Sequence, residues 1–225
     1  MEDADVQLRA LTGDQPISWE PLITVGKPAD EISRAVEERD IDLVITATRG
    51  RSGLKRIILG SVTERLMRTL ACPLLVVNSP EHKFVSTADQ VIKIEKILVG
   101  CDFSPDSGQA FNHALSLAQE FQAELHLAHV IEPPTQPDLN QEETTVSEEI
   151  QQDYRDLLAR KLKEMVPVEA RNWCTPKTSL LEGQPYEEIV TYAESKDTDM
   201  IVLGVRGHGL VKTLFLGSTT DRVVR

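Results

Sequence analysis

Glycines near the end of the chain are spaced in a way that could hold a phosphate group. The stretch reads Gly204-Val205-Arg206-Gly207, then nine further residues, then Gly217-Ser218. Gly204 and Gly207 let the backbone turn sharply and approach a ligand with no Cβ in the way. Gly217 and Ser218 are expected to open a helix, where free N–H groups and the positive end of the dipole favour an anion. With the hydroxyls of Ser218 and Thr220 as additional donors, the stretch predicts a phosphate cradle.

Two other residues are expected beside this cradle because they end neighbouring strands. The run Met200–Leu203, apolar on both faces, precedes the first glycine and is typical of a buried parallel strand. Asp102 follows a β-rich run over 91–99, and Val130 lies at the end of a second run over 125–131. Open α/β sheets bind ligands at the carboxyl ends of their strands. Asp102 and Val130 are therefore expected to face the glycine loops, although Asp102 could instead simply cap its own turn.

These residues resemble the universal stress protein family, whose ATP-binding members carry the pattern G-x2-G-x9-G-[ST]. Gly100-Cys101-Asp102-Phe103-Ser104-Pro105 is similar to the first strand-to-helix turn of that family. The resemblance implies that Asp102 contacts the adenosine portion and that the backbone of Val130 contacts adenine. The remaining implied contacts, to ribose and phosphates, come from Gly204, Arg206, Gly207, Gly217, Ser218, Thr219 and Thr220. The implied ligand is ATP, accompanied by magnesium.

The chain also repeats itself at an offset of 157 residues. At that offset Gly26-Lys27-Pro28 matches Gly183-Gln184-Pro185, and Leu59-Gly60-Ser61 matches Leu216-Gly217-Ser218. A period this long indicates duplicated domains and not a solenoid of short repeats. We interpret residues 1–80 as the C-terminal half of one universal stress protein domain, containing its strands three to five. Residues 81–93 are a linker, and residues 94–225 are a second domain that lacks its last strand.

Alternation of strand and helix patterns sets the expected fold. In the second copy, strands are predicted over 91–99, 125–131 and 178–181 and at Met200–Leu203, separated by helical patterns. Ser104-Pro105 is typical of an N-cap followed by proline at the first helical position. Such alternation implies right-handed βαβ units. The expected fold class is α/β: a doubly wound, open, parallel five-stranded sheet of Rossmann-like type, present as two incomplete copies.

The first copy departs from the nucleotide-binding pattern in two respects. Ala47 stands where the second copy has Gly204, and the half that would carry the aspartate strand is absent. Nucleotide binding is therefore expected in the second copy alone. The incomplete repeat has two explanations: the chain is a fragment, or another subunit supplies the missing strands.

Residues that invite a catalytic interpretation have simpler explanations. His208 is expected to be a solvated loop residue beside glycines, and Cys72 and Cys101 lie in or next to apolar strands and suit a core. Cys174 has no histidine near it in the sequence. We identify no catalytic residue and no metal-ligand cluster, and since no general base is evident, any ATP hydrolysis should be slow.

Composition narrows the class of partner. The 225 residues carry 36 acidic and 24 basic side chains, a net charge of −12. This balance argues against nucleic-acid binding and against an anionic membrane surface. The longest apolar runs have the length of strands, and three widely spaced cysteines fit a reducing cytoplasm. By family resemblance, the apolar run Leu74–Val77 is expected to pair with its counterpart in a homodimer.

Three functions remain open at this point. The first is a nucleotide-dependent regulatory protein of the stress response. The second is a scaffold of the same family that binds no nucleotide and works through dimerisation. The third is a related α/β enzyme such as an adenylyl transferase, but that class carries an H-x-G-H signature where this chain has Asp102-Phe103-Ser104-Pro105.

Overall fold

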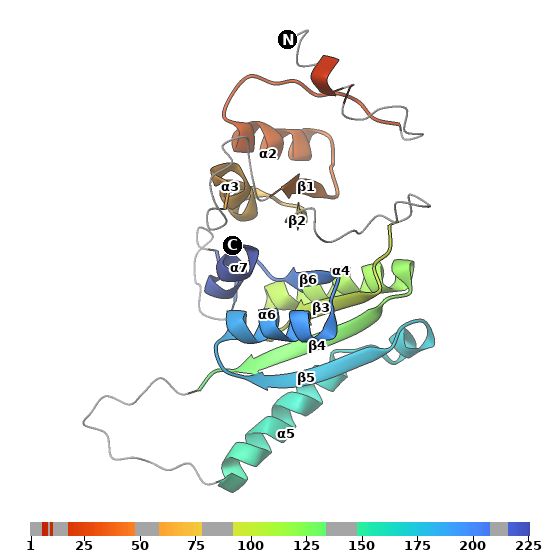
Figure 1. Cartoon of the computed structure of the whole chain (residues 1–225), viewed down its shortest axis with the longest axis vertical. Helices are drawn as coiled ribbons and strands as arrows, with labels where there is room; N and C mark the ends of the chain where they lie inside the picture. Colours follow the sequence, from red (N-terminus) through yellow and green to blue (C-terminus); the bar gives the residue numbers. More distant parts are fainter. Residues whose placement is uncertain are drawn as a thin grey trace, which may run out of the picture.

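The computed structural model describes residues 6–8, 10, 18–47, 59–77, 92–133, 148–207 and 216–225. Within these residues, the strands form one four-stranded sheet and one two-stranded sheet (Figure 1). The strands are β1 (Val44–Ala47), β2 (Leu74–Val77), β3 (Lys96–Gly100), β4 (Glu124–Ile131), β5 (Pro176–Glu182) and β6 (Met200–Leu203). The helices are α2 (Pro28–Glu38), α3 (Ser61–Thr69), α4 (Pro105–Phe121), α5 (Glu148–Glu164), the 3-10 helix η1 (Val168–Asn172), α6 (Pro185–Lys196) and α7 (Ser218–Val224).

The larger sheet has the strand order β5-β4-β3-β6, and every pairing in it is parallel. Strand β3 is central because its apolar residues can be buried on both faces: Ile97, Leu98 and Val99 are fully buried. It pairs on one side with β4, where Ile97 lies opposite Leu125, and on the other with β6, where Ile97 lies opposite Met200. Strand-helix alternation with a central first strand confirms the predicted doubly wound α/β fold.

Helices cover both faces of this sheet, as the alternation of side chains along β3 requires. On one face, Ile97 and Val99 share a core with Phe111 of α4 and Leu162 of α5. On the other face, Leu98 packs in a separate cluster with α6, through Ile189 and Ala193. In Figure 1, α6 and α4 lie on opposite sides of the sheet. This sandwich holds the carboxyl ends of β3, β4 and β6 in fixed positions relative to one another.

The turn that follows β3 forms as its sequence predicts. Ser104 is the N-cap of α4, its Oγ accepts a hydrogen bond from the Ser107 N–H at 3.2 Å, and Pro105 is the first helical residue. Proline suits this position because its missing N–H would have no intrahelical partner. The cap sets the direction in which α4 leaves the sheet.

The first copy contains β1 and β2 with helices α2 and α3, so strands are present at two of the three places where they were expected. Val44 lies opposite Leu74 and Ala47 opposite Val77 in a parallel pair. The predicted third strand is not formed: residues 18–25, the counterparts of β5 at the 157-residue offset, contain no strand, and Val25 is 87% exposed. In the second copy β5 is hydrogen-bonded to β4, and at the 157-residue offset none of the 225 residues corresponds to β4. Without that edge, the backbone of residues 18–25 has no partner with which to form a ladder.

The elements of the two copies follow each other in the same order. Helices α2 and α6 begin at Pro28 and Pro185, and helices α3 and α7 begin at Ser61 and Ser218, each pair 157 residues apart. None of the helices in the described ranges is both long enough and apolar enough to cross a bilayer.

Candidate functional site

The carboxyl ends of three neighbouring strands bring the predicted site residues to one edge of the sheet. Asp102 lies two residues after β3, Val130 is the penultimate residue of β4, and Gly204 directly follows β6. Because β4, β3 and β6 are adjacent and parallel, these positions lie side by side. Asp102, Val130 and Gly204 are all half-buried, which leaves each of them partly accessible. The predicted grouping at the strand ends is therefore present.

Gly204 is required for close packing and not for an unusual dihedral angle. A Cβ at this position would lie 2.8 Å from the backbone carbon of Asp106 and 2.9 Å from the Ser107 nitrogen, in the first turn of α4. Among the glycines of the described ranges, only Gly183 has a positive φ. The chain bends at residues 205–206 between Gly204 and Gly207, and the lack of a side chain at both glycines lets backbone and side chains approach closely.

Asp102 lies directly against the glycine loop. A Cβ on Gly207 would lie 2.6 Å from Asp102 Oδ2, so the space that a side chain would fill is occupied by the carboxylate. The other carboxylate oxygen, Oδ1, accepts a hydrogen bond from the Ser104 N–H at 3.0 Å. Ser104 Oγ in turn donates to the carbonyl of Arg206 at 3.4 Å. Asp102 therefore caps its turn, and the same turn is joined to the loop that carries Arg206 and Gly207.

Gly217 closes the other end of the loop as the N-cap of α7. Its φ is −60° and its ψ 137°, so the position requires no left-handed conformation. Its N–H donates to the Val205 carbonyl at 2.8 Å, and this donor is therefore engaged within the protein. A Cβ would lie 3.3 Å from that same carbonyl oxygen. Ser218 is exposed and Thr219 half-buried in the first turn of α7, whereas His208 lies outside the described residues.

Thr220 has a structural contact that its sequence position did not suggest. Its Oγ1 donates to the carbonyl of Gly204 at 2.7 Å and ties α7 to the end of β6. At the equivalent place in the first copy, Thr63 Oγ1 donates to the carbonyl of Ala47 at 3.2 Å. The contact is thus present with or without the glycine, and it uses the proton that Thr220 was expected to offer to a phosphate.

Two ring side chains beside Asp102 and Val130 were missed by the sequence analysis. Phe103 has a φ of 62°, a conformation that is rare for a bulky residue and strained. Its ring lies 4.7 Å from the His129 ring, centroid to centroid, and His129 Nδ1 is 2.7 Å from the Cys101 carbonyl oxygen. Lys161 Nζ lies 5.8 Å from the centre of the Phe103 ring. The sequence contained one indication of both residues: Phe103 directly follows Asp102, and His129 directly precedes Val130.

A polar cluster also lies at the opposite, amino-terminal end of β4. The buried His126 contacts Tyr192 OH through Nδ1 and Glu124 Oε2 through Nε2, both at 3.0 Å. Glu124 also accepts a hydrogen bond from Lys177 Nζ at 2.6 Å. The hydrogen bond with Lys177, and to a smaller extent the one with His126, lowers the pKa of Glu124 from 4.5 to about 2. The cluster links β4, β5 and α6, and it lies at the other end of the strand from Val130.

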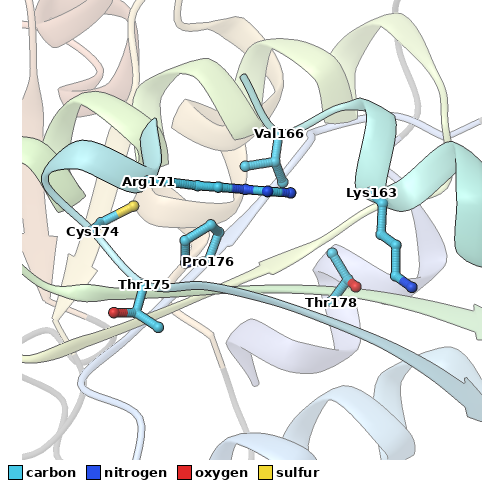
Figure 2. A pocket seen from close by; sticks show the side chains of 7 residues that line it. All are labelled: Lys163, Val166, Arg171, Cys174, Thr175, Pro176 and Thr178. Atoms are coloured by element: carbon cyan, nitrogen blue, oxygen red, sulfur yellow. The ribbon is translucent and has the colours of Figure 1, made fainter. Parts of the chain in front are cut away.

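Two surface hollows lie away from the glycine loops. One, of about 400 Å³, lies beside the start of β5 and is shown in Figure 2. The other, of about 460 Å³, lies between α2 and α3 of the first copy and includes Lys27 and Arg65. Neither is lined by a predicted nucleotide-binding residue. Within the described ranges, no three His, Cys, Asp or Glu residues are grouped to hold a metal ion.

Comparisons with known proteins agree with this architecture. The model of the "Universal stress protein family" matches residues 1–78 and 93–225. A universal stress protein of Methanocaldococcus jannaschii is 34% identical over 134 residues, which are 58% of this chain and 76% of that protein. The crystal structure of a universal stress protein from Archaeoglobus fulgidus has a TM-score of 0.60 and 24% identity. A putative universal stress protein from Pseudomonas aeruginosa has a TM-score of 0.65 and 19% identity.

The chain covers these solved structures only in part. The match to the Archaeoglobus structure takes in 89% of this chain and 64% of that one, and the match to the Pseudomonas structure 99% and 72%. At these identities the solved structures establish the fold, whereas the family match extends over most of the sequence in two segments. The chain therefore belongs to the universal stress protein family.

Proposed function

We propose that the second copy binds ATP or a closely related adenine nucleotide at the carboxyl ends of β3, β4 and β6. The observation that carries this proposal is the approach of the Asp102 carboxylate to Gly207, where a Cβ would lie only 2.6 Å from Oδ2. It brings the strand end expected to hold adenosine against the loop expected to hold phosphates. A carboxylate accepts hydrogen bonds from ribose hydroxyls, and a glycine backbone admits phosphate oxygens closely.

The charged and polar groups around the loop support this assignment of roles. Arg206 is half-buried, and its side chain forms no ion pair with any residue that the structure describes, so its guanidinium can pair with a phosphate. Val130 offers its backbone to the base, and Ser218 and Thr219 lie at the far side of the loop. Magnesium would be held mainly by phosphate oxygens and water, as is usual for this ion.

The first copy lacks the features on which this proposal rests. Ala47 stands at the position of Gly204, and its carbonyl accepts from Thr63 much as the Gly204 carbonyl accepts from Thr220. At the 157-residue offset, none of the 225 residues corresponds to Asp102. We therefore propose a single nucleotide site per chain, in the second copy.

Titration calorimetry with ATP and magnesium tests this proposal. The expected stoichiometry is one nucleotide per chain. Two equal sites per chain would contradict the distinction between the copies, and no binding in the folded protein would favour the scaffold function instead. Bound nucleotide would act on the contacts that the protein makes during a stress response.

An alternative function, assembly through dimerisation, has one structural observation in its favour. Strand β2 pairs with β1 on one side, and the described strands provide no partner on its other side. Its last residue, Val77, is 37% exposed. An unpaired apolar edge readily accepts another strand. We propose that β2 of one chain pairs with β2 of a second copy, an arrangement compatible with nucleotide binding.

A further inference from the structure

The hollow beside β5 lies at the opposite edge of the sheet from the glycine loops. It is formed where α5 ends, where η1 turns and where β5 begins, and its volume of about 400 Å³ falls within the range of small-molecule sites. Strand β5 is seven residues long, which separates its two ends by roughly 20 Å. A ligand here would not touch the proposed nucleotide site.

Two cationic side chains line this hollow without a partner. The side chains of Lys163, at the end of α5, and of Arg171, in η1, form no ion pair or hydrogen bond with any residue in the described ranges. Other cations nearby are paired: Arg155 with Glu182 at 2.7 Å, and Lys177 with Glu124 at 2.6 Å. In a chain with a net charge of −12, two unpaired cations in one hollow are a distinctive local feature.

No negative charge among the described lining residues opposes these cations. The rest of the lining contains neither aspartate nor glutamate. Cys174 contributes a thiol, and burial raises the pKa of that thiol, which keeps it neutral at physiological pH. The charged side chains that line the hollow are therefore both cationic, and cationic side chains favour anions.

The remaining polar groups are hydrogen-bond donors of the kind that an oxyanion needs. Thr178 presents a hydroxyl on the same side of β5 as Pro176, whereas the side chain of Thr175, one residue before the strand, points away from Arg171 (Figure 2). In Figure 2, the Arg171 side chain extends across the hollow between Val166 and Pro176, and Lys163 and Thr178 lie together at one side. A guanidinium offers five N–H donors in a planar fork and an ammonium offers three. Val166 and Pro176 provide an apolar surface beside these donors.

We propose that this hollow binds the phosphate group of a small phosphorylated molecule, with Arg171 and Lys163 as its charged ligands and Thr178 as a hydroxyl donor. Arg171 would hold two phosphate oxygens through its fork, and Lys163 would neutralise the remaining charge. The volume exceeds that of inorganic phosphate alone, so the rest of the molecule would lie against Val166 and Pro176. This site is separate from the proposed nucleotide site and does not depend on it.

Titration of the isotope-labelled full chain with inorganic phosphate, followed by NMR, tests the proposal. Sodium chloride at matched ionic strength serves as the reference. We expect saturable shifts of the backbone amides of Arg171, Thr175 and Thr178, with a dissociation constant in the millimolar range. Arg171→Gln should raise that constant by about tenfold, and Arg171→Lys should raise it less, because lysine keeps the charge but loses the fork.

Two control variants identify the source of any shifts. Arg160→Gln removes the same charge from α5 at an exposed residue that does not line the hollow, and it should leave the dissociation constant unchanged. Gly207→Ala alters the proposed nucleotide site, and it should also leave the Arg171 shifts unchanged. Shifts that Arg160→Gln reduces as much as Arg171→Gln would show general charge attraction and overturn the proposal. Shifts confined to the glycine loops, or none beyond those in chloride, would overturn it equally.

Discussion

The Asp102 carboxylate occupies the space that a side chain at position 207 would need, and position 207 is a glycine. The Asp102 Oδ2 atom would be 2.6 Å from a Cβ on Gly207, while Oδ1 accepts the Ser104 N–H at 3.0 Å. The carboxylate is thus held between the first turn of α4 and the loop that follows β6. Glycine at 207 is what allows these two parts of the proposed site to meet.

Gly207→Ala is therefore expected to displace Asp102 and weaken nucleotide binding. Loss of one charge-assisted hydrogen bond, about 1.5–3 kcal/mol, corresponds to an ATP affinity lower by roughly tenfold to a hundredfold. Calorimetric titration measures the affinity, and circular dichroism shows that the variant is folded.

Gly108→Ala is the matched control for this substitution. A Cβ at Gly108 meets no atom within 4 Å, and the residue lies inside α4. This variant should bind ATP as the parent does and should be more stable by about 0.5–1 kcal/mol, since alanine favours a helix over glycine. Equal affinity in Gly207→Ala and Gly108→Ala would show that the contact with Asp102 has no part in binding.

Gly217→Val and Gly60→Val form a second pair that separates the two copies. Both glycines precede a helix with nearly the same backbone geometry, φ −60° and ψ 137° at Gly217, φ −61° and ψ 135° at Gly60. Valine is allowed at these angles, so steric effects come from space alone. At Gly217 the Cβ would press on the Val205 carbonyl at 3.3 Å and shift the loop. We expect ATP affinity to fall at least about tenfold in Gly217→Val and to remain unchanged in Gly60→Val.

Thr220→Val and Thr63→Val test whether the threonine contact is structural in both copies. Each variant removes a hydroxyl that donates to a strand-end carbonyl, at 2.7 Å for Thr220 and 3.2 Å for Thr63. We expect each to lose about 1 kcal/mol of stability in urea unfolding, as is typical for one hydrogen bond. A large fall in ATP affinity in Thr220→Val with no loss of stability would instead place that hydroxyl on the nucleotide.

Acid sensitivity should depend on Glu124. Hydrogen bonds from Lys177 and His126 lower its pKa from 4.5 to about 2 in the folded protein. A carboxyl group whose pKa is lower in the folded protein than in the unfolded chain stabilises the folded protein at a pH above its unfolded pKa. That stabilisation is lost as the pH falls from about 4.5 towards 2. The Glu124 side chain is 38% exposed, so solvent screening reduces the effect. The urea concentration at the midpoint of unfolding should therefore decrease in the parent as the pH is lowered through this range.

Lys177→Met should flatten that part of the pH profile, because it removes the stronger of the two partners that lower the pKa of Glu124. Lys163→Met removes the same charge where the described residues provide no ion pair, and its profile should follow the parent. If Lys177→Met and the parent lost stability in parallel as the pH falls, Glu124 would not be the group responsible.

Dimerisation through β2 is tested by a charge at its edge. Light scattering at micromolar concentration should show the parent as a dimer. Val77→Lys places a charge at an exposed strand residue and should shift the protein towards monomer, since lysine at an edge opposes strand pairing. Val168→Lys, at a residue 74% exposed in η1, should remain dimeric. A parent that is monomeric under these conditions would contradict the proposal.

The sequence alone predicted the order of the elements in the second copy and the general place of the site. The apolar run Met200–Leu203 and the Ser104-Pro105 cap are local patterns, and they correspond to β6 and to the start of α4. The 157-residue offset relates the starts of α2 and α3 to those of α6 and α7. The expectation that Asp102 lies near the glycine loop also followed from sequence, because parallel strands bring their carboxyl ends to one edge.

Only the tertiary structure decided what each of these residues does there. Residues 18–25 form no strand because a strand needs a neighbouring edge, which the first copy does not provide and which no local pattern reveals. Glycine is needed at position 204 because α4 packs closely against it, and at position 207 because the Asp102 carboxylate does so. Neither glycine has a positive φ. The left-handed Phe103 and the unpaired Lys163 and Arg171 likewise depend on contacts between segments far apart in the chain, and such contacts exist only once the chain has folded.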